Sequence, residues 1–337
     1  MNAIISWFEG NIITGLSIQG AIAQGIIWGI MAIGVYITYR LLDFSDLSVD
    51  GTLGFGAAVS AILIVKGCNP YLSLLFATLA GAAAGLATGV FHTVFKIPPI
   101  LSGILTMIGL YSITIRVMDG SANTPLFQYE RVTTPINQLL QKWGMSADAV
   151  SNISALIIGA VFAVALIGIL YFFFGTEIGT AIRATGSNGN MSRALGVNTD
   201  AMKVLALVIS NALFGLSGAL IGQTQGAADV QVGQGAIVIG LASIIIGEVI
   251  MCRRDHSFWY KLLAVVVGSI IYRIIYALTI APLGQKLNLR AYDTKLITAL
   301  IIAIALAMPV IRKTVAEHKL RKTNDKRFAD AGGAENA

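Results

Sequence analysis

The sequence predicts an all-α polytopic membrane protein, and three observations lead to this fold class. The 337 residues are 56% hydrophobic and only 12% charged, whereas soluble domains carry about 25% charged residues. The apolar runs are about 20 residues long, which is the length that a helix needs to cross a bilayer. The runs lack the period-2 alternation that is typical of barrel strands. Because lipid offers no hydrogen-bond partner to backbone N–H and C=O groups, such runs form helices, in which these groups bond to one another. This composition argues against a soluble enzyme.

Apolar runs suggest about nine spans, within a range of eight to ten. They are 21–39, 51–66, 72–95, 100–118, 153–174, 203–222, 235–251, 259–280 and 294–311. Small residues recur every fourth position in some of them, as at Gly81, Gly85 and Gly89. In lipid such spacing is typical of helices whose backbones pack closely.

The flanking segments define the predicted organisation. Residues 1–20 are expected to form an amphipathic, interfacial segment, residues 21–311 the membrane domain, and residues 312–337 a basic tail. Lys and Arg are concentrated in alternate loops and in the tail, which predicts a cytoplasmic C-terminus. The loop 119–152 then lies outside, and its length suggests a short docking or capping helix.

Several kinds of chemistry are missing from the sequence. No Gly-Lys pair occurs, so the chain has no Walker A loop and cannot bind ATP in that way. The three histidines have no zinc-ligand spacing, and Cys68 and Cys252 are expected on opposite faces of the membrane. The basic excess does not form the stripe of a nucleic-acid binder. We therefore expect no catalytic residues, no metal, no cofactor of its own and no nucleic-acid partner.

A first polar segment, residues 42–56, lies between two apolar runs and contains three aspartates and three glycines. One interpretation is a loop that caps the next helix. The other is a broken polar helix that lines a transport path or its gate, as in many transporters. In that interpretation Asp46, Ser48 and Asp50 contribute to the path.

A second polar segment, residues 176–200, is too long for a simple connection. It suggests two short helices joined at 186–190, followed by a turn at 198–200 that caps the next span. A short helix lying along the membrane and presenting small side chains to a soluble partner would explain this length.

These two segments carry a resemblance to a known family. Residues 179–220 resemble the ATPase-coupling loop and following helix of ABC importer permeases of the branched-chain amino acid and ribose class. Residues 42–51 are similar to a polar segment of the same permeases. Residues 240–248 resemble most closely the subgroup associated with tryptophan or tyrosine uptake.

The resemblance implies partners and a coupling contact. It implies a homodimer in the cytoplasmic membrane of a prokaryote, two ATPase subunits that bind the ATP, an extracytoplasmic binding lipoprotein and a central path between the two permease copies. Gly186, Ser187, Asn188 and Met191 would enter a cleft of the ATPase. The full set of expected coupling residues is Arg183, Ala184, Gly186, Ser187, Asn188, Met191, Arg193 and Ala194.

Isolated polar residues within the runs complete the candidate set, because charges in hydrocarbon are costly. Asn211 could bond between helices or line the path, and Glu248 could pair with Arg253 or Arg254 or act in gating. Arg273, with Tyr272 and Tyr276 nearby, could face a protein interior or contact substrate.

Other functions remain open at this point. An ion-coupled secondary transporter would use Asp43, Asp46, Asp50 or Glu248 as its proton or sodium site. A channel would show flux without coupling, and a scaffold would show none. An ABC permease for a nucleoside or a sugar would share the fold of an amino-acid permease. The resemblance favours an ATP-driven amino-acid importer, aromatic amino acids first and branched-chain next.

Overall fold

The computed structural model describes residues 15–142, 147–251, 257–287, 299 and 303. The expected ninth run at 294–311, the basic tail and the first fourteen residues of the interfacial segment lie outside these ranges, apart from residues 299 and 303 themselves. The eight other predicted runs are all helical.

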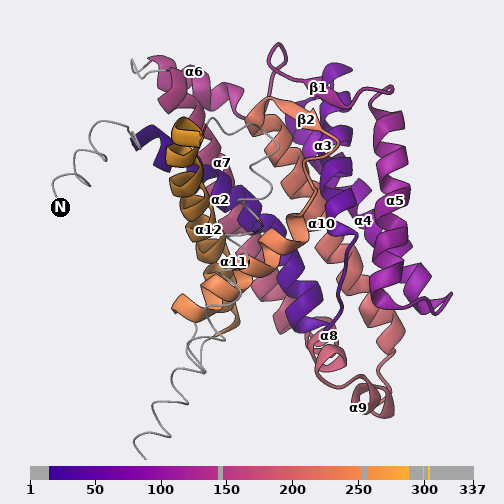
Figure 1. Ribbon diagram of the computed structural model, residues 1–337. Helices are drawn as coiled ribbons and strands as arrows, with labels where there is room; N and C mark the ends of the chain where they lie inside the picture. Colours follow the sequence, from indigo (N-terminus) through magenta and orange to yellow (C-terminus); the bar gives the residue numbers. More distant parts are fainter. Residues whose placement is uncertain (1–14, 143–146, 252–256, 288–298, 300–302, 304–337) are drawn as a thin grey trace, which may run out of the picture.

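The described chain is a helical membrane bundle (Figure 1). Its membrane helices are α2 (Gly15–Tyr36), continued by the π-helical turn η1 (Ile37–Leu41), α3 (Val49–Val65), α4 (Pro70–Thr93), α5 (Pro99–Val117), α7 (Ala147–Gly175), α10 (Thr199–Gln225), α11 (Ala236–Met251) and α12 (Phe258–Leu287). Six of these are long and apolar enough to span a membrane, whereas α3 and α11 are shorter apolar helices.

Helix α10 is the centre of the bundle, and glycines bring its neighbours close. A Cβ at Gly81 or Gly85 of α4 would meet the carbonyl oxygens of Asn211 and Leu207 on α10. A Cβ at Gly56 of α3 would likewise meet Gly215 of α10. Helices in lipid associate through such close backbone contact, so the small-residue spacing in the sequence marks these interfaces.

The two ends of the bundle carry different elements (Figure 1). At one end, the short strand β1 (Asn123–Pro125) pairs antiparallel with β2 (Ala227–Asp229), and Thr124 lies opposite Ala228. Helix α6 (Thr134–Lys142) lies at the same end, as expected for a long loop with a short helix. At the other end lie α8 (Glu177–Ser187) and α9 (Gly189–Ala194).

The first polar segment differs in one respect from the predicted broken helix at 42–56. The chain is non-helical from residue 42 to 48, but α3 is continuous from Val49 onward. The glycines do not break α3; they admit neighbouring backbone, since Gly51 faces Met107 and Gly54 faces the carbonyl of Val230. The interruption therefore precedes the helix instead of dividing it.

Candidate functional site

A buried hydrogen-bond cluster fixes the start of α3 beside the middle of α10. Asp46 Oδ2 accepts from Asn211 Nδ2 at 2.9 Å, and Asp46 Oδ1 accepts from the Ser48 N–H at 2.9 Å. Asn211 Oδ1 accepts from Thr52 Oγ1 at 2.7 Å. Asn211 lies near the midpoint of the 27-residue α10, so α3 begins at about half the depth of the bundle.

Helix α11 begins at the same depth, because Asp50 in the first turn of α3 holds its N-terminus. The Asp50 carboxylate accepts from Gly235 N at 2.9 Å and from Ile237 N at 3.1 Å. Gly233 allows this approach, since a Cβ there would meet the Asp50 carbonyl oxygen. The N-termini of α3 and α11 both carry positive partial charge, and the carboxylate is placed where it compensates both.

A cavity of about 350 Å³ opens beside this junction. Its lining combines apolar, aromatic and hydroxyl groups from α3, α5 and the segment before α11; it includes Asp50, Met107, Ile108, Tyr111, Ser112, Thr114, Val230 and Gln234. Ligand sites of this size are typically apolar with a few polar groups that orient the ligand. The cavity can therefore accommodate a small amphipathic molecule.

The α8–α9 segment presents an exposed surface at the far end of the bundle. The Asn188 side chain accepts from Met191 N at 3.0 Å and so caps α9. Met191 is 54% exposed and Leu195 is 73% exposed, and Ser187, Asn188, Arg193 and Ala194 are exposed as well. Apolar side chains exposed on a polar segment are typical of a protein–protein contact.

Gly186 faces inward instead of toward this surface. A Cβ at Gly186 would meet the Leu41 carbonyl oxygen and would lie 2.8 Å from Leu42 Cα. The backbone of α8 therefore touches the end of η1, directly before the polar segment 42–48. Ala184 is partly buried on the same helix.

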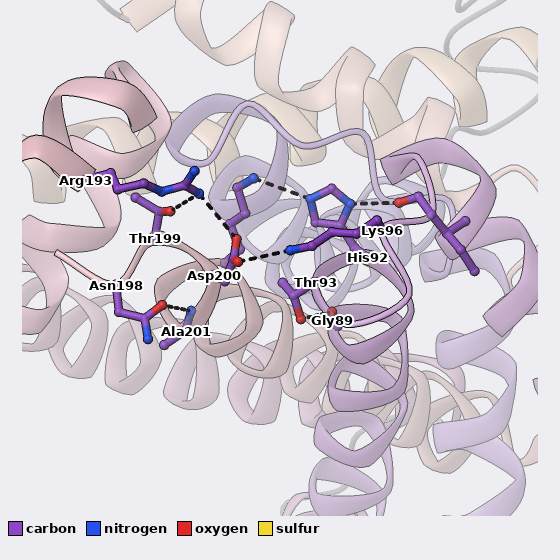
Figure 2. A network of polar contacts seen from close by, with 11 residues as sticks. Gly89, His92, Thr93, Lys96, Arg193, Asn198, Thr199, Asp200 and Ala201 are labelled. Carbon is purple, nitrogen blue, oxygen red and sulfur yellow. Dashed lines mark hydrogen bonds and ion pairs between the residues drawn. The ribbon is translucent and has the colours of Figure 1, made fainter.

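One ion pair joins α9 to α10, and a second joins α10 to the connection between α4 and α5 (Figure 2). Arg193 donates from Nη2 to Thr199 Oγ1 at 2.8 Å and lies 3.7 Å from Asp200 Oδ1 at the start of α10. Lys96, between α4 and α5, pairs with the other oxygen of Asp200 at 3.2 Å. The predicted cap at 198–200 is confirmed, since the Asn198 side chain accepts from Ala201 N at 3.1 Å.

A family comparison decides what kind of protein has this architecture. Residues 17–305 match the family model described as branched-chain amino acid transport system / permease component. The chain belongs to this permease family. The matched residues include the mid-depth junction, where α3 and α11 begin beside each other, together with the cavity next to it and the α8–α9 segment.

Three relatives place the permease among transport proteins. It is 38% identical over 310 residues to the tyrosine transport system permease protein of Clostridioides difficile, which covers 92% of this chain and 95% of the relative. It is 24% identical to the ribose import permease protein RbsC of Escherichia coli, over 90% of this chain and 88% of that one. It is 23% identical to the autoinducer 2 import system permease protein LsrC of Yersinia pseudotuberculosis, over 89% and 78%.

Two charged residues that the sequence singled out, Glu248 and Arg273, both have partners on other helices of the permease. Glu248, near the end of α11, pairs with Arg40 of η1 at 3.1 Å; Arg253 and Arg254 lie outside the described residues. Arg273 of α12 stacks on Trp28 of α2 at 4.3 Å from the ring centroid. Arg273 thus faces a protein interior, as one of its two interpretations expected.

A hydrogen-bond cluster around Gln223, at the opposite end of the permease, was not predicted from the sequence. Gln223, near the end of α10, is buried, accepts from Val132 N at 3.0 Å and donates to Ser60 and Ser73 at 2.9 and 3.0 Å. The neighbouring Arg131 donates to the Gln223 carbonyl at 3.3 Å, and burial lowers the pKa of Arg131. A glutamine near the end of an apolar run was the available signal.

Proposed function

We propose that the permease is the membrane subunit of an ATP-driven importer and passes an amino acid, with aromatic amino acids favoured, into the cell. The observation that carries this proposal is the exposed α8–α9 segment, attached to the helices that form the mid-depth junction. The relative named as a tyrosine transport system permease supports the substrate class. The ATP would be bound by separate ATPase subunits.

The α8–α9 segment would transmit movement of the ATPase along contacts in this chain. Ser187, Asn188, Met191 and Ala194 supply the exposed surface. The backbone of α8 touches η1 at Gly186 and Leu41, and η1 is joined to α11 through the Arg40–Glu248 pair. Displacement of α8 would therefore move the elements on both sides of the junction. A switch between two packed arrangements there can open the path alternately to the two faces of the membrane.

The cavity beside Asp50 would form part of the path. Asp50 supplies negative charge toward an ammonium group, while Tyr111 and Met107 offer apolar contact. Asp46, Ser48 and Asn211 are buried and form hydrogen bonds with one another. They would hold the start of α3, and with it Asp50, in place beside the cavity. Glu248 and Arg273 would act on helix positions rather than on the substrate.

The remaining parts of the assembly follow from the same proposal. A second copy of the permease would complete the path, and an extracytoplasmic binding protein would deliver the substrate to the end with β1, β2 and α6. The α8–α9 end, which carries Arg40, Lys96, Arg183 and Arg193, would then face the cytoplasm. The C-terminus would lie on that side.

The test is uptake by the full complex in liposomes. The chain is expressed with an ABC ATPase and an extracytoplasmic binding protein from the same organism, and uptake of labelled tyrosine is followed with and without ATP. Tryptophan and phenylalanine should compete, leucine less so, and ribose not at all.

Two controls separate the competing functions. An ion-coupled carrier would show uptake by the permease alone in a proton or sodium gradient, and an ionophore would abolish it. If ATP drove ribose uptake but not that of any amino acid, the substrate part of the proposal would be wrong.

A further inference from the structure

A second cavity, of about 300 Å³, lies where α7 ends and where α8 and α12 begin. It shares no lining residue with the cavity beside Asp50. Its lining is mostly aromatic with a single charged side chain, and includes Tyr171, Phe172, Phe174, Thr176, Arg183 and Phe258. The exposed coupling surface and the transport path proposed above do not include this cavity, although Arg183 is one of the coupling residues expected from the sequence.

The cavity lies at a membrane boundary. Helix α7 is an apolar span that ends at Gly175, so Tyr171 and Phe172 occupy its last turn. Phe172 is 78% exposed and Tyr171 is 50% exposed, while Phe174 beside them is buried. The exposed rings continue a stripe that includes Val161, Val164 and Ile169 on α7. Such a surface is suited to contact with acyl chains.

Arg183 supplies the positive charge of the cavity. Its guanidinium lies 5.4 Å from the centroid of the Phe258 ring, and Phe258 packs on Phe174 with ring centroids 5.2 Å apart. Among the described residues Arg183 forms no ion pair, and no acidic side chain lines the cavity. Glu177 follows Thr176 in the chain but is not part of the lining.

We propose that this cavity binds an anionic phospholipid of the leaflet on the α8–α9 side. The phosphate would lie at Arg183, where a guanidinium can bind it through two parallel hydrogen bonds. An acyl chain would follow Tyr171 and Phe172 along α7. Attraction of a basic side chain to anionic headgroups is an ordinary contribution to lipid recognition.

The positive charge of Arg183 favours a lipid over a second copy of the chain as the occupant of this face. A twofold interface presents the same surface from both partners. With its axis at this cavity, it would bring two Arg183 side chains together, and none of the described lining residues is acidic. A phosphate supplies the missing charge, and the apolar stripe continues into the acyl region.

The site would also affect coupling, and this consequence rests on the proposed function. Arg183 lies on α8, one turn from the Gly186 contact with Leu41. A bound lipid would hold α8 against α7 and α12. Lipid binding itself can be measured on the permease without the ATPase, so failure of the importer proposal would not affect this test.

The experiment measures lipid retention by the full chain. The protein is equilibrated in nanodiscs containing phosphatidylcholine and phosphatidylglycerol, transferred to mild detergent, and the lipid still bound per protomer is determined by mass spectrometry. The wild type should be enriched in phosphatidylglycerol. Arg183→Gln should reduce that enrichment by about fivefold, and Arg183→Lys should keep most of it.

Arg193→Gln is the matched control, because Arg193 is a nearby cation that pairs with Asp200 and does not line the cavity. Its lipid retention should equal that of the wild type. Equal retention of the two lipids by the wild type, or unchanged enrichment in Arg183→Gln, would overturn the proposal.

Two further outcomes test the other occupants. Displacement of phosphatidylglycerol by millimolar inorganic phosphate would assign the cavity to free phosphate. A Phe172→Cys variant, made in a background with Cys68→Ser and Cys252→Ser, tests for a second copy; rapid disulfide-linked dimer formation in the membrane would place another chain there. Either result would overturn lipid binding.

Discussion

The carboxylate of Asp50 accepts the N–H of Gly235 at 2.9 Å, although the two residues are 185 positions apart. This bond joins the beginnings of two short helices, α3 and α11, at the middle of a membrane bundle. Neither helix needs to cross the whole bilayer, because each begins from a non-helical segment held inside the protein. Such backbone is tolerated at membrane depth where it is buried in protein or lines a cavity.

Asp50→Asn should weaken this junction. The amide offers one acceptor oxygen in place of two, so one of the α11 N–H groups would lose its partner and face an NH₂ group. A hydrogen bond to a charged group contributes about 1.5–3 kcal/mol, and we expect a lower thermal unfolding midpoint in detergent together with reduced uptake. Ser112→Ala, on the same cavity, is the control for stability and should leave the midpoint unchanged. Unaltered midpoint and uptake in Asp50→Asn would contradict the role of Asp50 in joining α3 to α11.

Gly186→Ala should disrupt the contact between α8 and η1. The added Cβ would meet the Leu41 carbonyl oxygen and force α8 away from the membrane helices. ATP hydrolysis by the assembled complex should then respond less to substrate-loaded binding protein, while insertion of the permease into membranes stays normal. Gly189→Ala is the matched control, because nothing lies within 4 Å of its Cβ position. Equal stimulation of ATPase activity in the two variants would remove Gly186 from the coupling route.

Much of this architecture could be predicted from the sequence, because lipid imposes strict limits on length and polarity. Eight apolar runs appear as helices, and the polar segments at 42–56 and 176–200 lie where backbone or side chains meet other elements. Partners distant in sequence could not be predicted. Nothing local indicates that Asp50 bonds to Gly235, or that Glu248 pairs with Arg40, 208 positions away.

The glycines of α3 also show why tertiary contacts could not be predicted from the local sequence. In residues 51–56 their number suggested a break in the helix, since glycine lowers helix propensity. In the structure they allow close packing, because Met107, Val230 and Gly215 occupy the positions that a Cβ on these glycines would need. Propensity is a local property, and tertiary contact overrides it here.

Gly81→Ala should therefore destabilise the bundle, in contrast to Gly168→Ala. A Cβ at Gly81 would meet the Asn211 carbonyl oxygen, whereas Gly168 on α7 has no atom within 4 Å of its Cβ position. Overpacking costs about 1–3 kcal/mol, but alanine at an open helical position can stabilise slightly. Thermal unfolding in detergent should show a lower midpoint for Gly81→Ala only. Equal midpoints for the two variants would mean that α4 and α10 can separate at no cost.

The exposed apolar side chains of the α8–α9 segment allow the ATPase contact to be tested without disturbing the fold. Met191 and Leu195 are more than half exposed. Met191→Asp combined with Leu195→Asp therefore removes little packing and should leave the unfolding midpoint of the permease nearly unchanged. In a docked complex the same carboxylates would be desolvated without partners, which is strongly unfavourable. We expect the variant to lose co-purification with the ATPase. Substitution of Leu139→Asp, an exposed apolar residue on α6 at the opposite end, should leave it intact. Retention of the ATPase by the double variant would show that docking uses another surface.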